Sequence, residues 1–496
     1  MSVNASNAPL DFLIIGAGMS GMCMAIKLKE AGTESIAILE KSDDVGGTWL
    51  DNAYPNSGCD VPSFLYSYSF APRLNWSQKY ARQPEILQYF RDVADQFDIR
   101  KLICFRQTVT EARFDESTRL WKVRTREGQE WTARFLVSAV GQLNRPQIPG
   151  IPNAGKFRGV AWHSARWNKN VDLTGKRVAI IGNGASTIQF IPEVASKAAR
   201  LTLFQRTPSW IHPLYNYHYP RWATWMFENL PLAAALHRLW IFLACEWRII
   251  AFRRGSLANR IYRWWLIRQM KARLPDELHE TMIPKYEPGC KRILLSSDYL
   301  ETVQQRHVEV VSEPEIEFCE TGIKTKDRQI DLDVVIYGTG FQATDFLQSI
   351  QVTGLRGVSL AEAWKQRPQT LLGMMTPDFP NLFLLYGPNT NLGHNSIIYM
   401  VEGQVNYLIQ CFRYMQKNGH GEVEVRTDAV RRYDEELQKA LGESVWAGDC
   451  GSWYKKADGI IPNNWFGPAF SYRRRLKHPD FGSYLFRPGN VSKQPG

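Results

Sequence analysis

The chain has 496 residues, of which 44% are hydrophobic and 22% are charged. These proportions are those of an ordinary globular protein and exclude a disordered chain, and the length predicts two or three domains. The formal net charge of +11 comes from basic residues dispersed along the sequence. We therefore expect this charge to assist anionic small ligands, and we expect no nucleic-acid partner.

The N-terminus and the cysteines indicate the cellular setting. The first residues, MSVNASNAPLDF, have neither a basic start nor an apolar run, so we expect no signal peptide. The eight cysteines contain no CxxC pair. We therefore expect reduced thiols, a cytoplasmic location, no dithiol redox centre and no metal site.

The first elements have the pattern of a dinucleotide-binding unit. The sequence predicts a strand over residues 11–15, a helix from about Met19 to Gly32, and a second strand that ends at Glu40. Glycine suits the end of this helix because it adopts the left-handed conformation without steric cost. A strand, a helix and a second strand in this order predict the start of a doubly wound α/β domain.

The turn between this strand and helix reads GAGMSG and contains Gly16, Gly18 and Gly21. Its glycines permit a tight turn, close approach of a pyrophosphate to the backbone, and close packing of the helix on the strand. Glu40 follows Gly16 by 24 residues, where an acidic side chain meets the adenosine ribose. A carboxylate there accepts hydrogen bonds from both ribose hydroxyls, which predicts FAD, although NAD would fit as well.

A turn-rich loop, GGTWLDNAYPNSGCD, covers residues 46–60 and carries little information alone. Two strands are predicted in LWKVRTR and EWTARFLVSAVG, which end near Gly141, and the proline-rich segment NRPQIPGIP marks a boundary. We place the first part of the FAD-binding domain at residues 1–145.

A second unit of the same kind begins at Lys176 with the strand RVAII and the turn GNGAST. The residues expected to bind a second dinucleotide here are Gly182, Gly184, Ala185, Ser186 and Thr187. Thr187 stands where a third glycine is usual, and we expect its methyl group to push helix and strand slightly apart. Arg206 follows Gly182 by 24 residues, and an arginine near the ribose accommodates a 2′-phosphate, which predicts NADPH.

Tryptophan-rich, helical sequence occupies residues 210–285. Charged residues interrupt its apolar run, so the run falls short of the about 20 apolar residues that a membrane span needs. The pattern favours a helical insertion that covers a cleft, with contact to a membrane surface as the alternative.

Strands resume at residues 308–311 and 333–341, and a further strand precedes a long helix from about Ser396. This order favours one flavin domain that is split by an inserted nicotinamide domain. We therefore predict an α/β fold with two Rossmann-like dinucleotide-binding domains, for FAD and NADP, and with a helical insertion in the NADP domain. The NADP-binding domain is predicted at 146–344, with its insertion over about 210–285, and the second part of the FAD-binding domain, with a C-terminal lid segment, at 345–496.

Just before the second unit, residues 156–167 read KFRGVAWHSARW. Phe157, Gly159, His163 and Trp167 form the spaced pattern F-x-G-x-x-x-H-x-x-x-W. A histidine between two tryptophans is more often structural than catalytic, so we interpret His163 as a residue that orients the linker between domains.

The chain resembles the type I Baeyer–Villiger monooxygenases, a branch of the flavin-containing monooxygenase superfamily. The resemblance rests on GAGMSG, GGTW, YPNSGCD, the F-x-G-x-x-x-H-x-x-x-W pattern and GNGAST, and it extends from Phe12 to about Arg475. Two residues depart from the family pattern: Asn168, where proline or aspartate is usual, and Asn56, where glycine is usual. Trp167 favours the ketone-oxidising branch, because relatives that oxidise amine nitrogen or sulfide sulfur usually have tyrosine or phenylalanine there.

The resemblance implies roles for residues outside the two turns. In EPGCKRILLSSDYL, Lys291 and Arg292 match a pair in which the arginine lies against the flavin and the lysine recognises the NADPH phosphate. Asp60 matches the aspartate that pairs with this arginine. Trp453 matches a tryptophan of a mobile segment that folds over NADP. The resemblance also assigns to cofactor binding Gly47, Thr48, Trp49 and Tyr66.

The resemblance implies FAD- and NADPH-dependent insertion of one oxygen atom from O2 next to a ketone carbonyl, through a flavin C4a-peroxide, to give an ester or lactone. Arg292 and Asp60 are then the catalytic residues, because a permanent cation keeps the peroxide deprotonated and stabilises the oxyanion. The aromatic insertion predicts a lipophilic ketone as the substrate beside O2. The alternatives are oxidation of amine nitrogen or sulfide sulfur, a flavin or disulfide reductase, and a non-catalytic NADP sensor.

Overall fold

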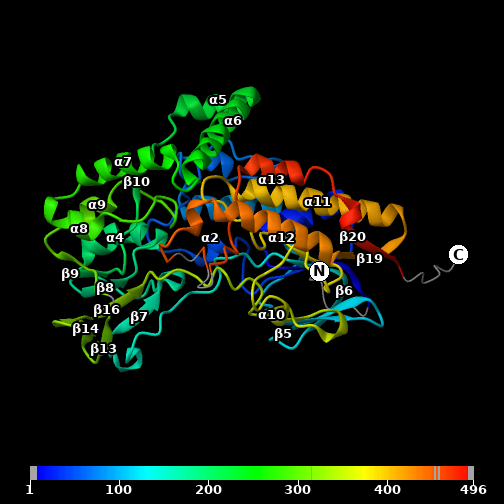
Figure 1. Ribbon diagram of the computed structural model, residues 1–496, viewed down its shortest axis with the longest axis horizontal. Coiled ribbons are helices and arrows are strands. Elements are labelled where there is room, and N and C mark those ends of the chain that lie inside the picture. Colours follow the sequence, from blue (N-terminus) through cyan, green and yellow to red (C-terminus); the bar gives the residue numbers. More distant parts are fainter. Residues whose placement is uncertain (1–7, 314, 452–453, 456–458, 490–496) are drawn as a thin grey trace.

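The computed structural model describes residues 8–313, 315–451, 454–455 and 459–489. This part of the chain forms two α/β units that lie side by side, with a pair of helices that projects above them (Figure 1). A mostly parallel sheet lies in each unit, so the α/β class predicted from the sequence is confirmed.

The larger sheet has eight strands. They are β1 (Leu10–Ile15), β2 (Ile36–Leu39), β3 (Ile103–Cys104), β4 (Val109–Asp115), β5 (Leu120–Thr125), β6 (Glu130–Ser138), β17 (Gln351–Thr353) and β18 (Leu382–Leu384). Their order is β17–β4–β5–β6–β1–β2–β3, and β18 also pairs with β6. β1 is buried over most of its length, as expected for a central parallel strand that is covered on both faces. The sheet joins strands that precede residue 140 to strands that follow residue 350.

The second large sheet has five strands, all parallel. They are β7 (Val160–His163), β8 (Arg177–Ile181), β9 (Arg200–Phe204), β12 (Val308–Val311) and β16 (Val334–Tyr337). Their order is β12–β9–β8–β16–β7. A small antiparallel sheet lies beside it and consists of β13 (Glu317–Cys319), β14 (Gly322–Lys324) and β15 (Gln329–Asp331).

Two helices pack together beside the larger sheet, α1 (Met19–Glu30) and α11 (Ile397–Lys417). α1 ends just before Gly32, which has φ of +85°, and α11 begins directly after Ser396, as the sequence predicts for both. The other helices outside the insertion are α2 (Thr48–Asp51), α3 (Gln83–Gln96), α4 (Ala185–Lys197), α9 (Tyr299–Thr302), α10 (Leu360–Ala363), α12 (Thr427–Gly442) and α13 (Ala469–Arg475).

The predicted helical insertion lies between two short strands that pair in parallel, β10 (Ile211–Pro213) and β11 (Leu294–Ser296). It contains α5 (Arg221–Asn229), α6 (Pro231–Trp247), α7 (Leu257–Lys271) and α8 (His279–Met282). α5 and α6 form the projection at the top of Figure 1. In the described part of the chain, no helix is both long enough and apolar enough to cross a membrane.

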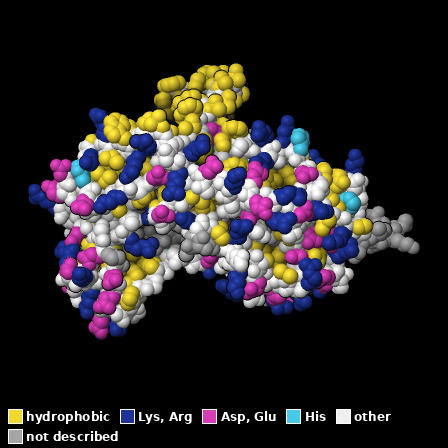
Figure 2. Space-filling view, viewed as in Figure 1, with side chains coloured by type: hydrophobic (Ala, Val, Ile, Leu, Met, Phe, Trp, Pro, Cys, Tyr) yellow, Lys and Arg dark blue, Asp and Glu magenta, His cyan; other side chains and the backbone are white. Residues whose placement is uncertain are grey.

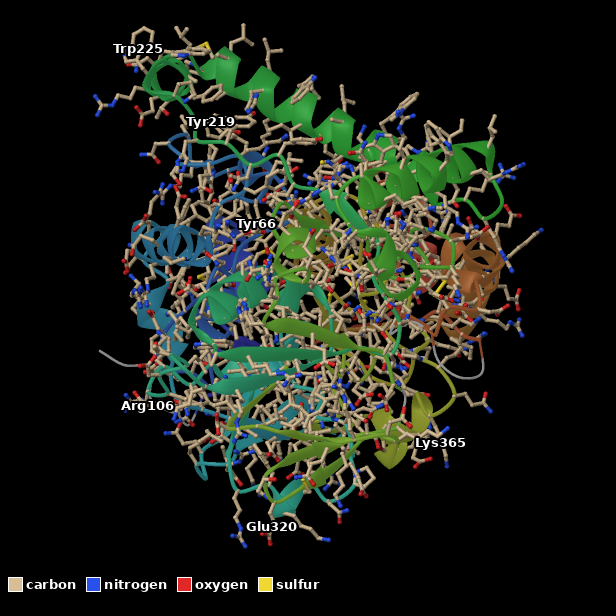
Figure 3. All side chains as sticks on the ribbon, turned by 90° about the vertical axis from the view of Figure 1, so that its left-hand side faces the viewer. Tyr66, Arg106, Tyr219, Trp225, Glu320 and Lys365 are labelled. Atoms are coloured by element: carbon tan, nitrogen blue, oxygen red, sulfur yellow. A yellow bond between two sulfur atoms is a disulfide. The ribbon has the colours of Figure 1, made fainter. Side chains whose placement is uncertain are left out.

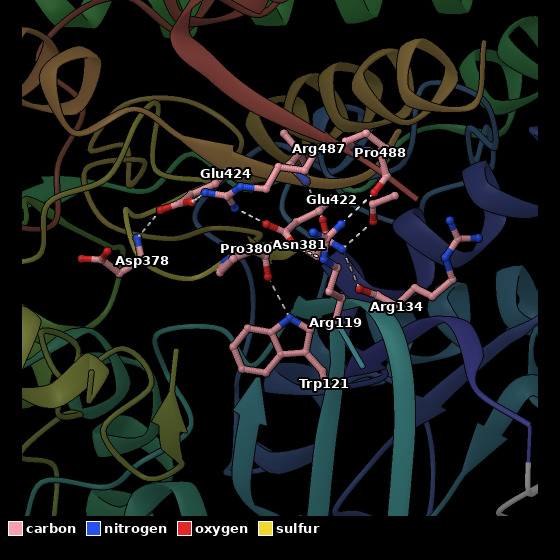
Figure 4. A network of polar contacts seen from close by, with 12 residues as sticks. Arg119, Trp121, Arg134, Asp378, Pro380, Asn381, Glu422, Glu424, Arg487 and Pro488 are labelled. Atoms are coloured by element: carbon pink, nitrogen blue, oxygen red, sulfur yellow. Dashed lines mark hydrogen bonds and ion pairs between the residues drawn. The ribbon is translucent and has the colours of Figure 1, made fainter. Parts of the chain in front are cut away.

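A polar network fastens the C-terminal hairpin, β19 (His420–Val425) and β20 (Tyr484–Pro488), to the larger sheet (Figure 4). The amide nitrogen of Asn381 donates to the carbonyl oxygens of Arg134 and Gly421, each at 3.0 Å. Arg487 of β20 pairs with Glu422 and Glu424 of β19. The hairpin is therefore held to strands that lie almost 300 residues earlier.

Candidate active site

The first glycine turn joins β1 to α1 and leaves no room for a side chain at Gly16 or Gly21. Gly16 has φ of +104°, and a Cβ there would lie 2.7 Å from the carbonyl oxygen of Ala139. A Cβ on Gly21 would lie 1.9 Å from the carbonyl oxygen of Gly16, so α1 packs backbone against backbone on the turn. Gly18 precedes α1 and makes no side-chain cap. The first N–H groups of α1 are therefore available to an anion such as a pyrophosphate.

Glu40 lies at the end of β2 and is buried. Its Oε2 accepts a hydrogen bond from the N–H of Ala17 at 2.7 Å, and its Oε1 accepts one from the N–H of Ser42 at 2.9 Å. The carboxylate thus fastens the end of the strand to the glycine turn. Each carboxylate oxygen has a second acceptor position, so hydrogen bonds from ribose hydroxyls are compatible with this arrangement.

The second glycine turn joins β8 to α4 with the same geometry. Gly182 has φ of +100°, and a Cβ there would lie 2.6 Å from the carbonyl oxygen of Gly338. Gly184 precedes α4 without a side-chain cap, and Ala185 begins the helix. Thr187 is fully buried, and a Cβ on Gly338 would lie 2.0 Å from its Oγ1. Gly338, which follows β16, therefore provides the space that Thr187 needs between helix and strand.

Glu40 and Arg206 follow the first glycine of their turns by the same number of residues, but they do not occupy equivalent positions in the structure. Gly16 and Gly182 each donate their N–H to the carbonyl oxygen of the last residue of the next strand, at 2.8 Å in both turns. By this register, Glu40 corresponds to Gln205, and Arg206 lies one residue further on. An equal spacing of 24 residues in the sequence thus places Arg206 beyond the strand end, where its side chain is exposed.

A cluster of cations lies next to this strand end. The pairing of β10 with β11 brings Lys291 close to Arg206, and the Nζ of Lys291 donates to the Oγ1 of Thr207 at 2.5 Å. Burial and the charge of Arg206 lower the pKa of Lys291. Within the described residues, neither cation has a carboxylate partner, so this cluster fits a phosphate dianion.

Arg292 and Asp60 form an ion pair across 232 residues of sequence. The Nη2 and Nε of Arg292 donate to the Oδ2 of Asp60 at 2.5 and 3.0 Å. Both side chains are mostly buried, with 29% and 28% of their surface exposed. The charge of Asp60 raises the pKa of Arg292, so the guanidinium remains a permanent cation at any working pH.

The loop after β2 brings an aromatic pair to the first glycine turn. A Cβ on Gly47 would lie 3.1 Å from the Cα of Gly18, so the two segments touch through their backbones. Thr48 is exposed and begins α2, and the next residue, Trp49, donates its Nε1–H to the hydroxyl of Tyr66 at 3.1 Å. Gly47, Thr48, Trp49 and Tyr66 therefore lie together beside the turn of the first unit.

The same loop also bridges the two units. The Oε1 of Gln189 in α4 accepts hydrogen bonds from the hydroxyl of Tyr54 at 3.0 Å and from the N–H of Gly58 at 3.2 Å. Its Nε2 donates to the carbonyl oxygen of Gly58 at 3.0 Å. Asn56, which departs from the family pattern, has φ of +59°, a conformation that asparagine tolerates better than most residues.

Comparison with known proteins decides the family. The flavin-binding monooxygenase-like family matches residues 11–353. A Baeyer–Villiger monooxygenase of Pseudomonas aeruginosa is 36% identical over 95% of this chain and 90% of its own length. The chain belongs to this family, in its Baeyer–Villiger branch. An FAD-binding monooxygenase of Aspergillus niger is 39% identical over 96% of the chain and 81% of its own length.

Solved structures agree with the family assignment. OTEMO in complex with FAD and NADP has a TM-score of 0.88 and 30% sequence identity, and the match covers 97% of this chain and 100% of that chain. The type I Baeyer–Villiger resemblance and the fold class with two Rossmann domains, both predicted from the sequence, are therefore confirmed.

Two tyrosines of this monooxygenase were not singled out by the sequence. Tyr386 and Tyr454 lie near Arg292: burial raises the pKa of each hydroxyl, and the charge of Arg292 opposes that rise. The hydroxyl of Tyr386 also donates to the Oδ1 of Asn391 at 2.7 Å. Tyr386 follows β18, at the carboxyl edge of the sheet where ligands of α/β proteins bind, which is the signal that could have identified it.

The C-terminal segment approaches the same place. Trp453 lies outside the described residues, so its role remains a prediction, but the residue that follows it, Tyr454, is buried near Arg292.

Cys290 and Cys450 form a disulfide, which corrects the expectation that all thiols are reduced. The pair is 160 residues apart and has no CxxC spacing, so no local motif indicates it. It joins the residue before Lys291 to the segment that precedes Trp453.

The histidine of the spaced pattern has a structural position. His163 ends β7 and is buried, and its Nδ1 accepts a hydrogen bond from the N–H of Ala165 at 3.1 Å. Burial lowers the pKa of His163, which agrees with a neutral ring that accepts at Nδ1.

Trp167 is the last residue of the pattern, and Asn168 follows it directly. Trp167 packs against Phe190 of α4, with ring centroids 5.2 Å apart. Asn168 accepts a hydrogen bond from the N–H of Asn170 at 3.0 Å. Asn168 therefore starts a turn, a position that suits asparagine.

Proposed function

We propose that this Baeyer–Villiger monooxygenase inserts one oxygen atom beside the carbonyl group of a lipophilic ketone, and that Arg292 is the group that makes this reaction possible. The observation that carries the proposal is the mostly buried ion pair between Arg292 and Asp60. The product is an ester or a lactone.

The residues of both turns fit the two dinucleotides. The backbone spaces at Gly16, Gly21 and Gly182 are cradles that a Cβ would fill, and α1 and α4 each begin without a side-chain cap. We assign FAD to the first turn, with Glu40 at its ribose, and NADPH to the second, with Arg206 and Lys291 at its 2′-phosphate. When bound, NADPH supplies the hydride and FAD supplies the activation of O2.

Arg292 holds negative charge at the reacting oxygen. Its guanidinium stays protonated because Asp60 raises its pKa, so it favours a deprotonated oxygen nucleophile next to it. The same cation then stabilises the charge that develops on the ketone oxygen. A preorganised donor of this kind contributes about 3 kcal/mol, roughly a hundredfold in rate.

Asp60 positions this cation. The Oδ2 of Asp60 accepts hydrogen bonds from both the Nε and the Nη2 of Arg292, which fixes the plane of the guanidinium. Tyr386 and Tyr454 lie close by with hydroxyls that stay protonated, because burial raises the pKa of both. These neutral hydroxyls border the cation without neutralising its charge.

The test separates the two half-reactions in the Arg292→Ala enzyme. We expect ester formation to fall by roughly a hundredfold or more, whereas anaerobic reduction of bound FAD by NADPH stays within a few fold of the parent. Stopped-flow absorbance measures the reduction, and gas chromatography measures the ester.

The matched control is Arg158→Ala, which removes an exposed arginine that pairs with Glu320 on the surface. Ester formation at the parental rate in Arg292→Ala would show that Arg292 is not the catalytic cation. Loss of ester with retained oxidation of a thioether would confirm that the cation serves the ketone reaction specifically.

A further inference from the structure

α6 exposes a row of large apolar side chains on the side that faces away from the core, although Ile241 and Cys245 on its other side are buried. Six large apolar residues face solvent, and each side chain is more than half exposed: Leu232, Leu236, Leu239, Trp240, Leu243 and Trp247. Their spacing of three or four residues puts them on one side of the helix. A helix of a globular protein normally turns such a stripe toward the core, whereas in α6 this stripe has no apolar partner within the described residues.

The polar residues of α6 explain this orientation. Arg238 donates from Nη1 to the carbonyl oxygen of Phe64 at 2.5 Å and from Nη2 to that of Ser67 at 3.0 Å. Glu246 is buried and accepts hydrogen bonds from the Nδ2 of Asn395 at 2.6 Å and from the N–H of Ala469 at 3.1 Å. Rotation of the helix would break these contacts and bury unpaired charges, so α6 is fixed with its apolar stripe outward.

The neighbouring helices extend this surface. On α5 and α7, five further large side chains are each more than half exposed: Trp222, Trp225, Leu257, Ile261 and Trp264. Figure 2 shows the projection of α5 and α6 as a continuous hydrophobic area, and Figure 3 shows Trp225 at its outer end, far from the body of the protein. We call the eleven side chains of the three helices the apolar face.

Basic residues border the apolar face. Between residues 221 and 272, the exposed charged side chains are Arg221, Glu228, Arg248, Arg253, Arg254, Arg260, Arg268 and Lys271. All but Glu228 are positive. No exposed charged side chain lies between Glu228 and Arg248, so the apolar part of the projection is uninterrupted.

We propose that the apolar face docks the enzyme onto the surface of an anionic lipid bilayer. Leucine and tryptophan side chains enter the boundary between headgroups and acyl chains, and the bordering arginines contact the lipid phosphates. Tryptophan favours this boundary because one edge of its ring is apolar and the other donates a hydrogen bond. The proposed contact is with the membrane surface, because no helix in the described part of the chain could cross a bilayer.

The charge pattern favours a bilayer over a second copy of the chain. A two-fold dimer would place the same patch of each subunit against the other. The exposed arginines around the apolar face would then oppose one another, with Glu228 as their one exposed acidic neighbour in this segment. An anionic membrane would bury the apolar surface and neutralise the charge of the positive border at the same time.

Sedimentation with lipid vesicles tests the proposal on the FAD-loaded, full-length enzyme. We expect binding to vesicles that contain phosphatidylglycerol, and binding weaker by roughly tenfold or more to vesicles of phosphatidylcholine alone, because each arginine near an anionic surface contributes about fivefold. Raising the salt concentration should weaken the binding to anionic vesicles.

The double variant Leu236→Ser/Trp240→Ser tests the apolar part. Both side chains are exposed, so their replacement leaves the fold intact, and we expect at least about a tenfold loss of vesicle binding. The matched control is Ile148→Ser, which changes a side chain that is 56% exposed outside the insertion and should bind as the parent does.

Absence of binding to anionic vesicles at low salt would overturn the proposal. Sedimentation velocity without lipid then identifies the other occupant: a dimer that the double variant dissociates would make the apolar face a contact between two copies. Equal vesicle binding by the parent and the double variant would also overturn it.

Discussion

The two glycine turns share one backbone geometry and differ in what surrounds them. Gly16 and Gly182 have φ of +104° and +100°, and a Cβ on either would meet a carbonyl oxygen at 2.7 or 2.6 Å. After the first turn, Glu40 is buried and bonded to the backbone, whereas Arg206 after the second is exposed beside Lys291. From this comparison we propose that the turn forms a general cradle for a pyrophosphate, and that residues just after the next strand select the nucleotide.

Substitution of Gly21, the third glycine of the first turn, should have the largest effect on stability and FAD binding. Gly21→Ala places a Cβ 1.9 Å from the carbonyl oxygen of Gly16, and backbone atoms cannot yield as a flexible side chain can. We expect the free energy of unfolding to fall by about 3 kcal/mol or more, with loss of bound FAD. Urea unfolding and the ratio of flavin to protein absorbance measure both effects.

Gly155→Ala is the matched control, because a Cβ there meets no atom within 4 Å. Parental stability and FAD content in Gly21→Ala would show that α1 can move away from β1, and that the two turns are less alike than their backbones indicate.

We propose that the preference of the second turn for NADPH depends on Arg206. Arg206→Ala removes a charge-assisted contact to the 2′-phosphate, so we expect kcat/KM for NADPH to fall by roughly ten- to a hundredfold, while kcat/KM for NADH stays nearly constant. Steady-state oxidation of both cofactors measures the ratio.

The control is Arg200→Ala, which removes an exposed arginine at the start of β9 that pairs with Glu309. If the preference for NADPH survives in Arg206→Ala, the assignment of Arg206 to the 2′-phosphate is wrong, and another cation contacts this phosphate.

A smaller effect concerns the pH dependence of NADPH binding. Lys291 has a lowered pKa, so it loses its proton at a lower pH than an ordinary lysine, and the binding of NADPH should weaken as the pH rises through that pKa. Arg206→Ala removes one cause of the lowering, which should shift this weakening to higher pH. We expect a change in KM of less than about tenfold across the transition.

Lys291→Met should abolish the alkaline weakening altogether. The measurement is KM for NADPH against pH, and a profile that is identical in the parent, Arg206→Ala and Lys291→Met would exclude Lys291 from the phosphate site.

Local patterns predicted much of the fold. The strand at residues 11–15, the helix that stops at Gly32 and the long helix after Ser396 follow from apolar period and from glycine at helix ends. The hydrogen bond from the N–H of Ala17 to Glu40 lies within the same strand–helix–strand unit, so the motif alone places these two residues near each other. The equal spacing of 24 residues did not make Arg206 structurally equivalent to Glu40. In the second unit, the strand after the helix ends one residue earlier relative to the first glycine, so Gln205 is the equivalent residue.

Long-range contacts of the site could not be derived from local patterns. Asp60 and Arg292 are paired in the structure across 232 residues, and only the family resemblance indicated that pair. The space that Gly338 gives to Thr187 depends on two strands that meet in the sheet. The outward stripe of α6 could not be predicted either, because this helix has apolar residues on both sides and the sequence does not show which side faces the protein.

The central claim is that this enzyme oxygenates ketones, and product analysis tests it most directly. FAD-loaded enzyme would be incubated with NADPH, O2 and a panel of linear, cyclic and aryl ketones, together with a thioether and an amine. We predict esters or lactones in proportion to the NADPH consumed. NADPH consumption that yields only a sulfoxide or an N-oxide, with no ester from any ketone, would contradict the proposed function.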